Sequence, residues 1–374
     1  MDATKRRATI RLHLAEGVGG TTLGRLREAF GGAAAAVAAS PAQLRAVKGI
    51  GEKTAAAVAA VTDAQVDDEL AAAERAGVCV LVRGEAGYPR ALETIHDPPE
   101  VLYVRGELRD TDAVAVGIVG ARRCSHYGME QAGRFGELLG RAGFTVVSGG
   151  ARGIDTAAHR GALGSGGRTV AVMGCGLSRT YPRENRELFE RIVTDGRGAI
   201  VSELPMGLDI RAGNFHARNR IISGLSLGVL VVEAARRSGS LITARQADEQ
   251  GRLVFAVPGR VDSPTSAGTN ELIRDGATLV QNLDDLLEQL GPVGAEMGEA
   301  PHAEAPPMPA GLSDAETKLV EALGGGELTL DELTRRTGVP SARVAASMTM
   351  LVIKGAVAQK PGNVFAIKRR GADR

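Results

Sequence analysis

The chain has 374 residues, of which 44% are hydrophobic and 24% are charged, and its formal net charge is +1 at pH 7. This is the composition of a soluble globular protein, and it excludes a protein that is basic all over, so any nucleic acid would need a local positive patch. No run of 18 uncharged apolar residues occurs, no apolar segment follows the basic N-terminus, and Cys79, Cys124 and Cys175 have no paired spacing. We therefore expect a cytoplasmic protein without a membrane span, signal peptide, disulfide framework, metal or other cofactor.

Arginine dominates the basic residues, because only seven of the 45 are lysines and 38 are arginines. Arginine forms planar, bidentate contacts with phosphate and stacks on bases, whereas lysine acts as a point charge. Codon bias in a GC-rich genome explains the total equally well, and the abundance of Ala and Gly agrees with it. Individual arginine clusters are therefore more informative than the count.

Residues 1–85 are Ala-rich with helical periodicity and are predicted to form a small helical domain. The segment 44–56 contains Lys48-Gly49-Ile50-Gly51 and reads as a helix–hairpin–helix, while the glycines at 17–20 ahead of a helix at 23–30 resemble a degenerate first copy. Two roles stay open for the hairpin, which are phosphate contact through Lys48 and Lys53, or helix packing alone.

Residues 86–290 alternate short apolar runs with helical patterns, which predicts a Rossmann-like, doubly wound parallel sheet. Five strands are predicted, at Val114–Val119, Thr145–Ser148, Thr169–Met173, Gly228–Val232 and Val254–Val257. Helices are predicted near 127–142, 155–164, 183–194, 215–226 and 239–251. Ligands of such sheets bind beyond the carboxyl ends of the strands, so the loops after the strands are where we expect function.

Four loops after predicted strands are rich in glycine, and three of them contain arginine. They span 117–123, 148–155, 174–177 and 233–240. Glycine lets the backbone approach an anion closely, and an arginine in the same loop adds a charge-assisted contact. Four such loops on one sheet predict an extended anion-binding rim rather than a single nucleotide pocket.

A local basic patch follows, because residues 211–237 contain five arginines and only one acid, Glu233. Phe215 stands among these arginines, as expected for a side chain that stacks on unpaired bases, with Tyr181 and Tyr127 as lesser candidates. The alternative is that Phe215 belongs to the core and that Arg218 and Arg220 are structural ion-pair partners.

Other chemistry is weakly supported. None of the loops spells Gly-x-Gly-x-x-Gly, no acid stands where a ribose contact belongs, and no Walker A motif occurs, so neither a dinucleotide nor ATP hydrolysis is predicted. Asp155 and His159 lie four residues apart on one predicted helix, but a helix-capping Asp and a structural His explain this pair better than acid–base catalysis.

Residues 291–311 hold five of the 15 prolines and are predicted to be a linker. Helices predicted at 313–323, 329–337 and 340–354, with a hairpin around Gly362-Asn363, resemble a winged helix over 312–370. Its third helix offers only Arg343 and Lys354 to DNA, so we favour a protein-contact or regulatory role.

The middle segment, about 85–282, resembles the DNA-processing protein A family (DprA, also called Smf). The likeness is carried by many ordered motifs: Tyr88-Pro89, Asp97-Pro98-Pro99, Leu102-Tyr103, Arg105-Gly106, Val119–Arg122, Ser148–Asp155, Ala158-His159, Tyr181-Pro182, Ser202-Glu203, Phe215, Arg218–Arg220, Ser238–Ser240, Pro258-Gly259 and Gly268–Asn270. The resemblance implies a homodimer that binds single-stranded DNA and loads the recombinase RecA onto it, in natural transformation and homologous recombination, without being an enzyme.

The resemblance also assigns roles, with Arg122 as a phosphate-binding arginine, the glycines of 149–153 as a DNA-facing loop and Phe215 as the base-contacting aromatic. Ala121, Ala212 and His216 depart from the family pattern, and Arg211 is a plausible substitute for a lysine that some members carry at 212. The expected single-stranded-DNA site consists of Gly120, Arg122, Arg123, Gly149, Gly150, Arg152, Gly153, Arg211, Phe215, Arg218, Arg220, Arg237, Ser238 and Gly239.

Two competing functions remain. Nucleoside-monophosphate phosphoribohydrolases have related Rossmann folds and Gly-rich loops, and Glu203 or Glu233 would then be the carboxylate over the ribose. A duplex binder that uses the winged helix is the other. The apolar residues around Leu272-Ile273 and 277–280 are the candidate dimer interface.

Overall fold

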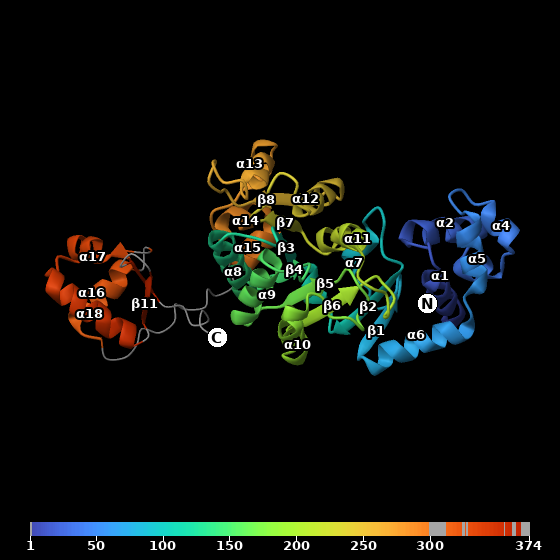
Figure 1. Ribbon diagram of the computed structural model, residues 1–374, viewed down its shortest axis with the longest axis horizontal. Helices are drawn as coiled ribbons and strands as arrows, with labels where there is room; N and C mark the ends of the chain where they lie inside the picture. Colours follow the sequence, from blue (N-terminus) through green and yellow to red (C-terminus); the bar gives the residue numbers. More distant parts are fainter. Residues whose placement is uncertain are drawn as a thin grey trace. The chain divides into compact units, whose positions relative to one another are not determined.

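The computed structural model describes residues 2–298, 312–323, 326, 328–354, 356–360 and 364–367. It divides into two compact units, Met1–His302 and Ala303–Arg374, which we describe separately (Figure 1). Within the described residues, no helix is long and apolar enough to cross a membrane.

Six helices open the first unit; the apolar residues of the first five share a core of their own, whereas those of the sixth pack with the first two strands. They are α1 (Ala3–Leu14), α2 (Gly20–Phe30), α3 (Ala33–Ala38), α4 (Pro41–Arg45), α5 (Glu52–Ala60) and α6 (Asp63–Arg75). The predicted hairpin joins α4 to α5, and Gly49 in this turn has φ +88°, a conformation that favours glycine. The turn between α1 and α2, predicted as a degenerate first hairpin, is covered by another part of the unit. A side chain at Gly20 would meet the side chain of Asp97.

A nine-stranded sheet forms the centre of the first unit, with the order β1-β2-β6-β5-β4-β3-β7-β8-β9. The strands are β1 (Val78–Val82), β2 (Val101–Gly106), β3 (Ala115–Val119), β4 (Thr145–Ser148), β5 (Thr169–Val172), β6 (Gly198–Ser202), β7 (Gly228–Val231), β8 (Leu253–Ala256) and β9 (Thr278–Leu279). The strands from β6 to β9 run parallel, and β2 and β1 extend the sheet in antiparallel fashion. The predicted Rossmann-like sheet is therefore confirmed.

Four strands were not predicted, namely β1, β2, β6 and β9. Of these, β1 moves the start of the sheet to Val78, before the predicted domain boundary at 85. Its exposed and buried residues alternate, which is the pattern of a strand with one solvated face rather than of the central strands. The five residues of β1 are all apolar, so residue type does not reveal that one of its faces is solvated.

Helices cover both faces of the sheet, which brings the loops between them to the sheet's ends (Figure 1). On one face lie α8 (His126–Arg141), α9 (Ile154–Gly164), α10 (Arg186–Thr194) and α14 (Leu283–Gln289). On the other lie α7 (Arg90–Glu93), α11 (Ala212–Gly224) and α12 (Ser240–Glu249). Short 3-10 turns occupy 110–113 and 183–185, and α13 (Ala267–Arg274) precedes β9.

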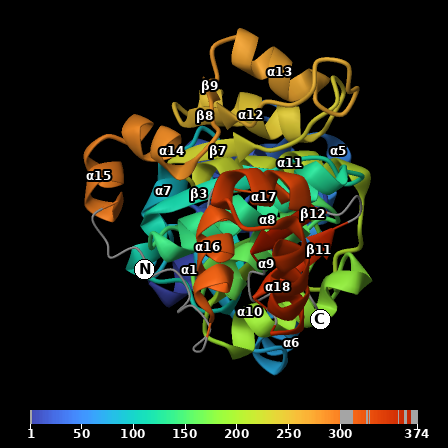
Figure 2. The same cartoon turned by 90° about the vertical axis from the view of Figure 1, so that its left-hand side faces the viewer.

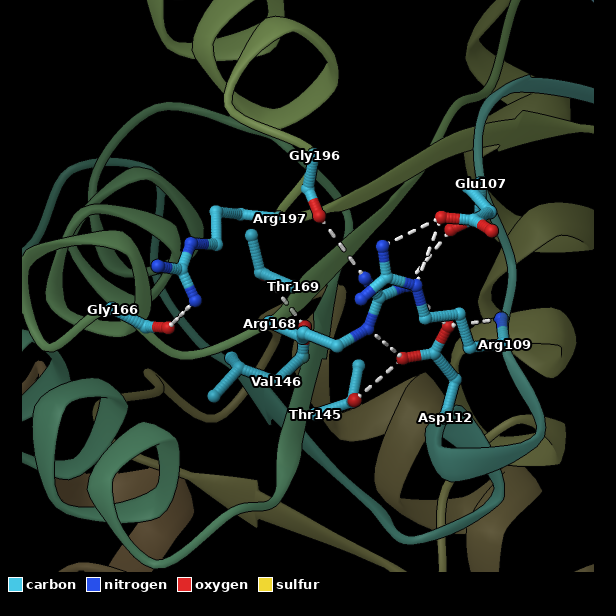
Figure 3. Close-up of polar contacts among 10 residues, drawn as sticks. All are labelled: Glu107, Arg109, Asp112, Thr145, Val146, Gly166, Arg168, Thr169, Gly196 and Arg197. Carbon is cyan, nitrogen blue, oxygen red and sulfur yellow. Dashed lines mark hydrogen bonds and ion pairs between the residues drawn. The ribbon is translucent and has the colours of Figure 1, made fainter.

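The amino-terminal edge of the sheet is closed by a network of polar contacts (Figure 3). Arg168 donates through Nε and Nη2 to the two carboxylate oxygens of Asp112, at 2.7 and 2.8 Å. Asp112 also accepts from the hydroxyl of Thr145 and the amide of Arg109, at 2.7 and 2.8 Å. Burial opposes ionisation of Asp112, yet the hydrogen bond from Arg168 and the others hold its pKa below its ordinary value. The charges at this edge are thus matched within the protein.

The segment predicted as a linker begins with a helix instead. Residues Pro292–Gly298 form α15, and Met297 packs against the core beneath α8 and α14. Proline at the first helical position is compatible with a helix, which the proline content of the segment concealed. The rest of the predicted linker, 299–311, lies outside the described residues.

The second unit has the fold of a winged helix, as predicted (Figure 2). It consists of α16 (Asp314–Leu323), α17 (Leu330–Thr337), α18 (Ser341–Ile353), β10 (Leu328–Thr329), β11 (Val357–Lys360) and β12 (Val364–Ile367). The strands form one sheet in the order β10-β12-β11. Gly362 and Asn363, the predicted hairpin tip, lie outside the described residues.

Candidate functional site

A cavity of about 550 Å³ opens at the carboxyl edge of the sheet, where the Gly-rich loops meet. Its walls come from the loops after β3, β4, β5 and β7 and from the first halves of α11 and α12. It is lined by Val119, Gly120, Arg122, Ala151, Asp155, Tyr181, Ile210, Ala212, Phe215, His216, Arg218, Asn219, Ile222, Ser238, Gly239, Ser240 and Thr243. The Gly-rich loops therefore meet at the carboxyl edge of the sheet, as predicted.

Phe215 stands at the centre of an aromatic and cationic group in this cavity. The Arg122 guanidinium carbon lies 4.9 Å from the centroid of the Phe215 ring, and the Tyr181 ring centroid lies 5.6 Å from it. The ring rests on Gly174, where any side chain would meet it. Phe215 is only partly buried and belongs to none of the apolar core clusters of the described residues, so it is not a core residue.

Arg218 and Asp155 form the charged floor of the cavity. Arg218 is 4% exposed, donates to the carbonyl of Val172 and has no partner for its Nε among the described groups. Burial lowers its pKa to about 10, opposed by the nearby Asp155 carboxylate. Burial likewise raises the pKa of Asp155 to about 6, opposed by Arg218 and by the amides of Ala151 and Gly149. The floor therefore carries a permanent cation beside an acid that changes charge near neutral pH.

Glu233 ties two of the cavity loops together. Its carboxylate, 2% exposed, accepts the amide of Ser125 at 3.1 Å and the hydroxyl at 2.8 Å, and its carbonyl accepts the Ala121 amide at 2.7 Å. The loop that carries Arg122 is thus fastened at both ends to the loop after β7. This explains why an acid occurs in the basic segment.

Arg220, predicted as a DNA contact, is held by intramolecular partners in the structure. Its guanidinium forms two hydrogen bonds to the Glu203 carboxylate, at 2.7 and 2.6 Å, and donates to the carbonyl of Asp97 at 2.8 Å. It is buried and does not line the cavity. The ion-pair interpretation was therefore right for Arg220, although not for Arg218.

Two glycines of the predicted DNA-facing loop are buried in the structure. A side chain at Gly149 would collide with the guanidinium of Arg218, and one at Gly150 with the ring of Phe189. These glycines make room for neighbouring side chains. Gly153, at φ +77°, and Gly120 likewise allow the loop after β3 and α9 to approach each other.

Four arginines of the expected site lie around the cavity without lining it. Arg152 forms an ion pair with Glu184, with 2.5 Å between Nη2 and Oε1, so a carboxylate already neutralises its charge. Arg123, Arg211 and Arg237 are exposed, and within residues 2–298 no side-chain hydrogen bond or ion pair engages them. These three are free to meet a ligand at the rim.

Several lining residues were missing from the expected site. They are Val119, Ala151, Asp155, Tyr181, Ile210, Ala212, His216, Asn219, Ile222, Ser240 and Thr243. Tyr181 had been a lesser candidate for base stacking and Asp155 a candidate helix cap, and Ala212 and His216 had been noted as departures from the family pattern. Asn219 lies between Arg218 and Arg220, and the other lining residues are small or apolar.

Of the groups considered for catalysis, Asp155 lines the cavity, whereas His159, Glu203 and Glu233 are engaged elsewhere. His159 is fully buried, its Nδ1 lies 2.6 Å from the hydroxyl of Thr169, and burial lowers its pKa to about 3. Glu203 is held by Arg220 and Glu233 by Ser125, and neither lines the cavity. The described residues contain no group of three or more His, Cys, Asp or Glu side chains suited to a metal ion.

Comparison with protein families decides the relationship. The profile of DNA recombination-mediator protein A matches residues 79–291, the sheet domain with its cavity. The chain belongs to this family. The DprA winged-helix profile matches residues 303–363, and the helix-hairpin-helix motif matches 34–61, in agreement with both flanking folds.

Individual relatives agree with the family. The chain is 40% identical to Protein Smf of Escherichia coli (strain K12) over 283 residues, which cover 75% of each chain. It is 39% identical to the DNA processing protein DprA of Bacillus subtilis (strain 168) over 59% of this chain and 74% of that protein.

Two solved structures of the family are similar as well. The X-ray structure of DNA processing protein A from Streptococcus pneumoniae has a TM-score of 0.66 at 33% identity, covering 76% of this chain and 97% of that one. DNA processing protein A from Helicobacter pylori, whose structure is described as showing a single-stranded DNA binding mode, has a TM-score of 0.51 at 31% identity, covering 57% of this chain and 95% of that one.

Proposed function

We propose that this protein binds single-stranded DNA at the carboxyl edge of its sheet and acts as a recombination mediator without catalysis. The observation that carries the proposal is the Arg122–Phe215 pair at the mouth of a cavity whose floor is the buried Arg218. An aromatic face beside arginine charge suits an unpaired base with its phosphate alongside. The single-stranded DNA binding described for the Helicobacter pylori relative supports the same ligand class.

A nucleotide would be held by both of its parts. Its base contacts the exposed part of the Phe215 ring, next to Tyr181, and its phosphate lies between Arg122 and Arg218. These two arginines and Asp155 give the cavity one net positive charge while Asp155 is ionised. A duplex hides its base faces, so the cavity favours single strands.

The proposal that the protein is not an enzyme rests on the carboxylates. A phosphoribohydrolase needs a carboxylate free to act on a ribose, and Glu203 and Glu233 are both held by protein donors. Measurable release of bases from nucleoside monophosphates, lost with Glu233→Gln, would contradict this part of the proposal.

Homodimerisation and loading of RecA, which the family resemblance implies, belong to the same proposal. The sheet ends in β9, an edge strand whose Leu279 is 41% exposed, and an uncovered edge is suited to pairing with a second copy. Leu279→Glu is expected to produce monomers in light scattering and to slow RecA filament formation on DNA coated with single-strand-binding protein. Val280, part of the same candidate interface, is fully buried and is better left unchanged.

For the winged helix we propose a protein-contact or regulatory role. Lys354, one of its two candidate DNA-reading cations, is paired with Glu316 at 2.8 Å, which leaves Arg343 as the exposed one. Deletion of 312–374 should leave most of the affinity for single strands intact. Loss of binding on this deletion would instead favour a duplex binder that uses the winged helix.

The first experiment is the binding of the purified protein to fluorescent single- and double-stranded oligonucleotides over a series of salt concentrations. We expect a strong preference for the single strand and an affinity that falls as salt rises. Arg152→Ala is a matched control, because this exposed arginine is already paired and lies outside the cavity. Equal affinity for both forms of DNA would overturn the proposal.

A further inference from the structure

We propose that the DNA track continues beyond the cavity to a second base-stacking position at Tyr127, reached across a strip of unpaired arginines. This inference rests on the proposed function, and it assigns a contact outside the cavity. The occupant is the part of the same single strand that follows the nucleotide held at Phe215.

Tyr127 is an unusual exposed aromatic. It lies in the first turn of α8 with 45% of its surface exposed, and its hydroxyl donates to the carbonyl of Pro258 at 3.1 Å. This hydrogen bond fixes the ring between α8 and the loop after β8 while leaving part of it to solvent. A fixed, solvent-facing ring is what base stacking requires.

Arginines fill the space between the cavity and Tyr127. Arg122 lines the cavity, and Arg123 follows it in the same loop, four residues before Tyr127. From the neighbouring loop after β7 come Arg236 and Arg237, immediately before the cavity residue Ser238. In the described part of the first unit, the side chains of Arg123, Arg236 and Arg237 are exposed and have no hydrogen bond or ion pair. Their charge is thus available to phosphates.

The order of the strands places these groups in one line. Gly174 beneath Phe215 follows β5, Arg122 follows β3, Arg236 follows β7 and Pro258 follows β8. In the sheet these strands lie in the order β5-β4-β3-β7-β8, all parallel, so their carboxyl ends share one edge. Four strand spacings give a path of about 19 Å, longer than a single nucleotide. The strip is therefore continuous with the cavity, and its exposed arginines come from the loops after β3 and β7.

The test compares the affinities of the full-length protein for oligothymidylates of about four and about 16 nucleotides, which bracket the usual range of site sizes. We expect Tyr127→Ala to lower affinity for the longer strand on the order of tenfold and to leave the shorter strand unchanged. Tyr127→Phe keeps the ring and should retain affinity for both lengths. Thermal unfolding of each variant confirms that the fold is intact.

A second readout does not depend on affinity. The chain has no tryptophan and four tyrosines, of which Tyr88 and Tyr103 are buried, so bound DNA can quench by contact only the fluorescence of Tyr127 and Tyr181. Quenching of Tyr127 by the longer strand should be absent in Tyr127→Phe and present in Tyr181→Phe.

The outcomes separate this inference from the proposed function. If Tyr127→Ala leaves both affinities unchanged, or lowers both equally, there is no second stacking position at Tyr127. If neither oligonucleotide binds the unmodified protein, or if Phe215→Ala and Arg122→Ala bind both as well as it does, the proposed function fails first.

Discussion

The arginines at the two edges of the central sheet differ in whether a carboxylate pairs with them. At the amino-terminal edge, Arg168 is held by both oxygens of Asp112, and the pair is mostly buried (Figure 3). At the carboxyl edge, Arg122 contacts the Phe215 ring, and Arg123 and Arg237 have no ion pair within residues 2–298. The same residue type stabilises the fold at one edge and remains available at the other.

This difference teaches how a nearly neutral protein can bind a polyanion. Guanidinium groups that are paired with carboxylates stabilise the fold, and the two opposite charges of each pair sum to zero. Unpaired guanidinium groups on one edge of the sheet create a local positive field. The parallel sheet sets this polarity, since its Gly-rich loops follow the carboxyl ends of the strands. Variants at the two edges should therefore affect different measurements.

The largest expected effect is on stability at the amino-terminal edge. Asp112→Ala leaves Arg168 without its partner in a largely buried position and should lower the free energy of unfolding by about 3–5 kcal/mol. Chemical denaturation measures this loss, and affinity for single strands at temperatures where the variant is folded should not change. A stable Asp112→Ala variant with weakened DNA binding would contradict the separation of stability at the amino-terminal edge from DNA binding at the carboxyl edge.

At the carboxyl edge, the largest expected effect is that of Phe215→Ala. Loss of the stacking face should reduce the free energy of binding to single strands by about 1–3 kcal/mol. Because the ring is only partly buried and outside the core clusters of the described residues, its removal should affect stability much less. Equilibrium binding and thermal unfolding, measured together, decide between the two roles. A large loss of stability without a change in affinity would make Phe215 a core residue after all.

Arg122→Ala should have a smaller and salt-dependent effect. One phosphate contact fewer should decrease the slope of the logarithm of affinity against the logarithm of salt concentration by about 0.7 for single strands. Since Arg122 makes no ion pair with the described residues 2–298, stability should change by no more than about 0.5 kcal/mol. An unaltered slope would remove Arg122 from the site.

The smallest effect concerns pH. The Asp155 carboxylate lines the cavity with its pKa raised by burial to about 6, so it loses its charge as the pH falls from 7 to 5. Affinity for the phosphodiester backbone should rise over that interval, and Asp155→Asn should abolish the Asp155 contribution. His216 also lines the cavity, so both proteins are compared in a His216→Gln background. An unchanged pH dependence in the Asn variant would contradict this role.

The same shift has a consequence for stability. Because the folded state raises the pKa of Asp155 above its ordinary 3.8, it binds the proton more tightly than the unfolded chain. The resulting stabilisation is complete below about pH 4 and disappears as the pH rises through about 6. Asp112, whose pKa is lowered, acts in the opposite sense and stabilises the protein above its ordinary pKa.

Much of this site was predictable because its parts repeat a simple rule. Short apolar strands predicted a parallel sheet, and a parallel sheet brings the loops that contain Arg122 and Ser238 to one edge. Phe215 stood out as an aromatic among arginines. The lining by Ala212, Ile210 and Thr243 was beyond prediction, since small and apolar residues at a cavity wall look like any others.

Arg218 and Arg220 mark the limit of the sequence. They are two positions apart in α11, and two helical steps of about 100° place them on nearly opposite sides of the helix. Helical periodicity therefore predicts that the two side chains lie on different sides of α11, but not which of them faces the cavity. That was decided by Asp97 and Glu203, which are distant in sequence and reach Arg220 only in the folded protein.

By itself, the sequence determined the sheet, its functional edge and the aromatic at its centre, because local patterns of apolar residues and glycine control those features. Only the tertiary structure decided which arginines are matched by carboxylates and which glycines are buried beneath neighbouring side chains. The reason is physical: the availability of a charge depends on partners that folding brings from far along the chain, and no local pattern records them.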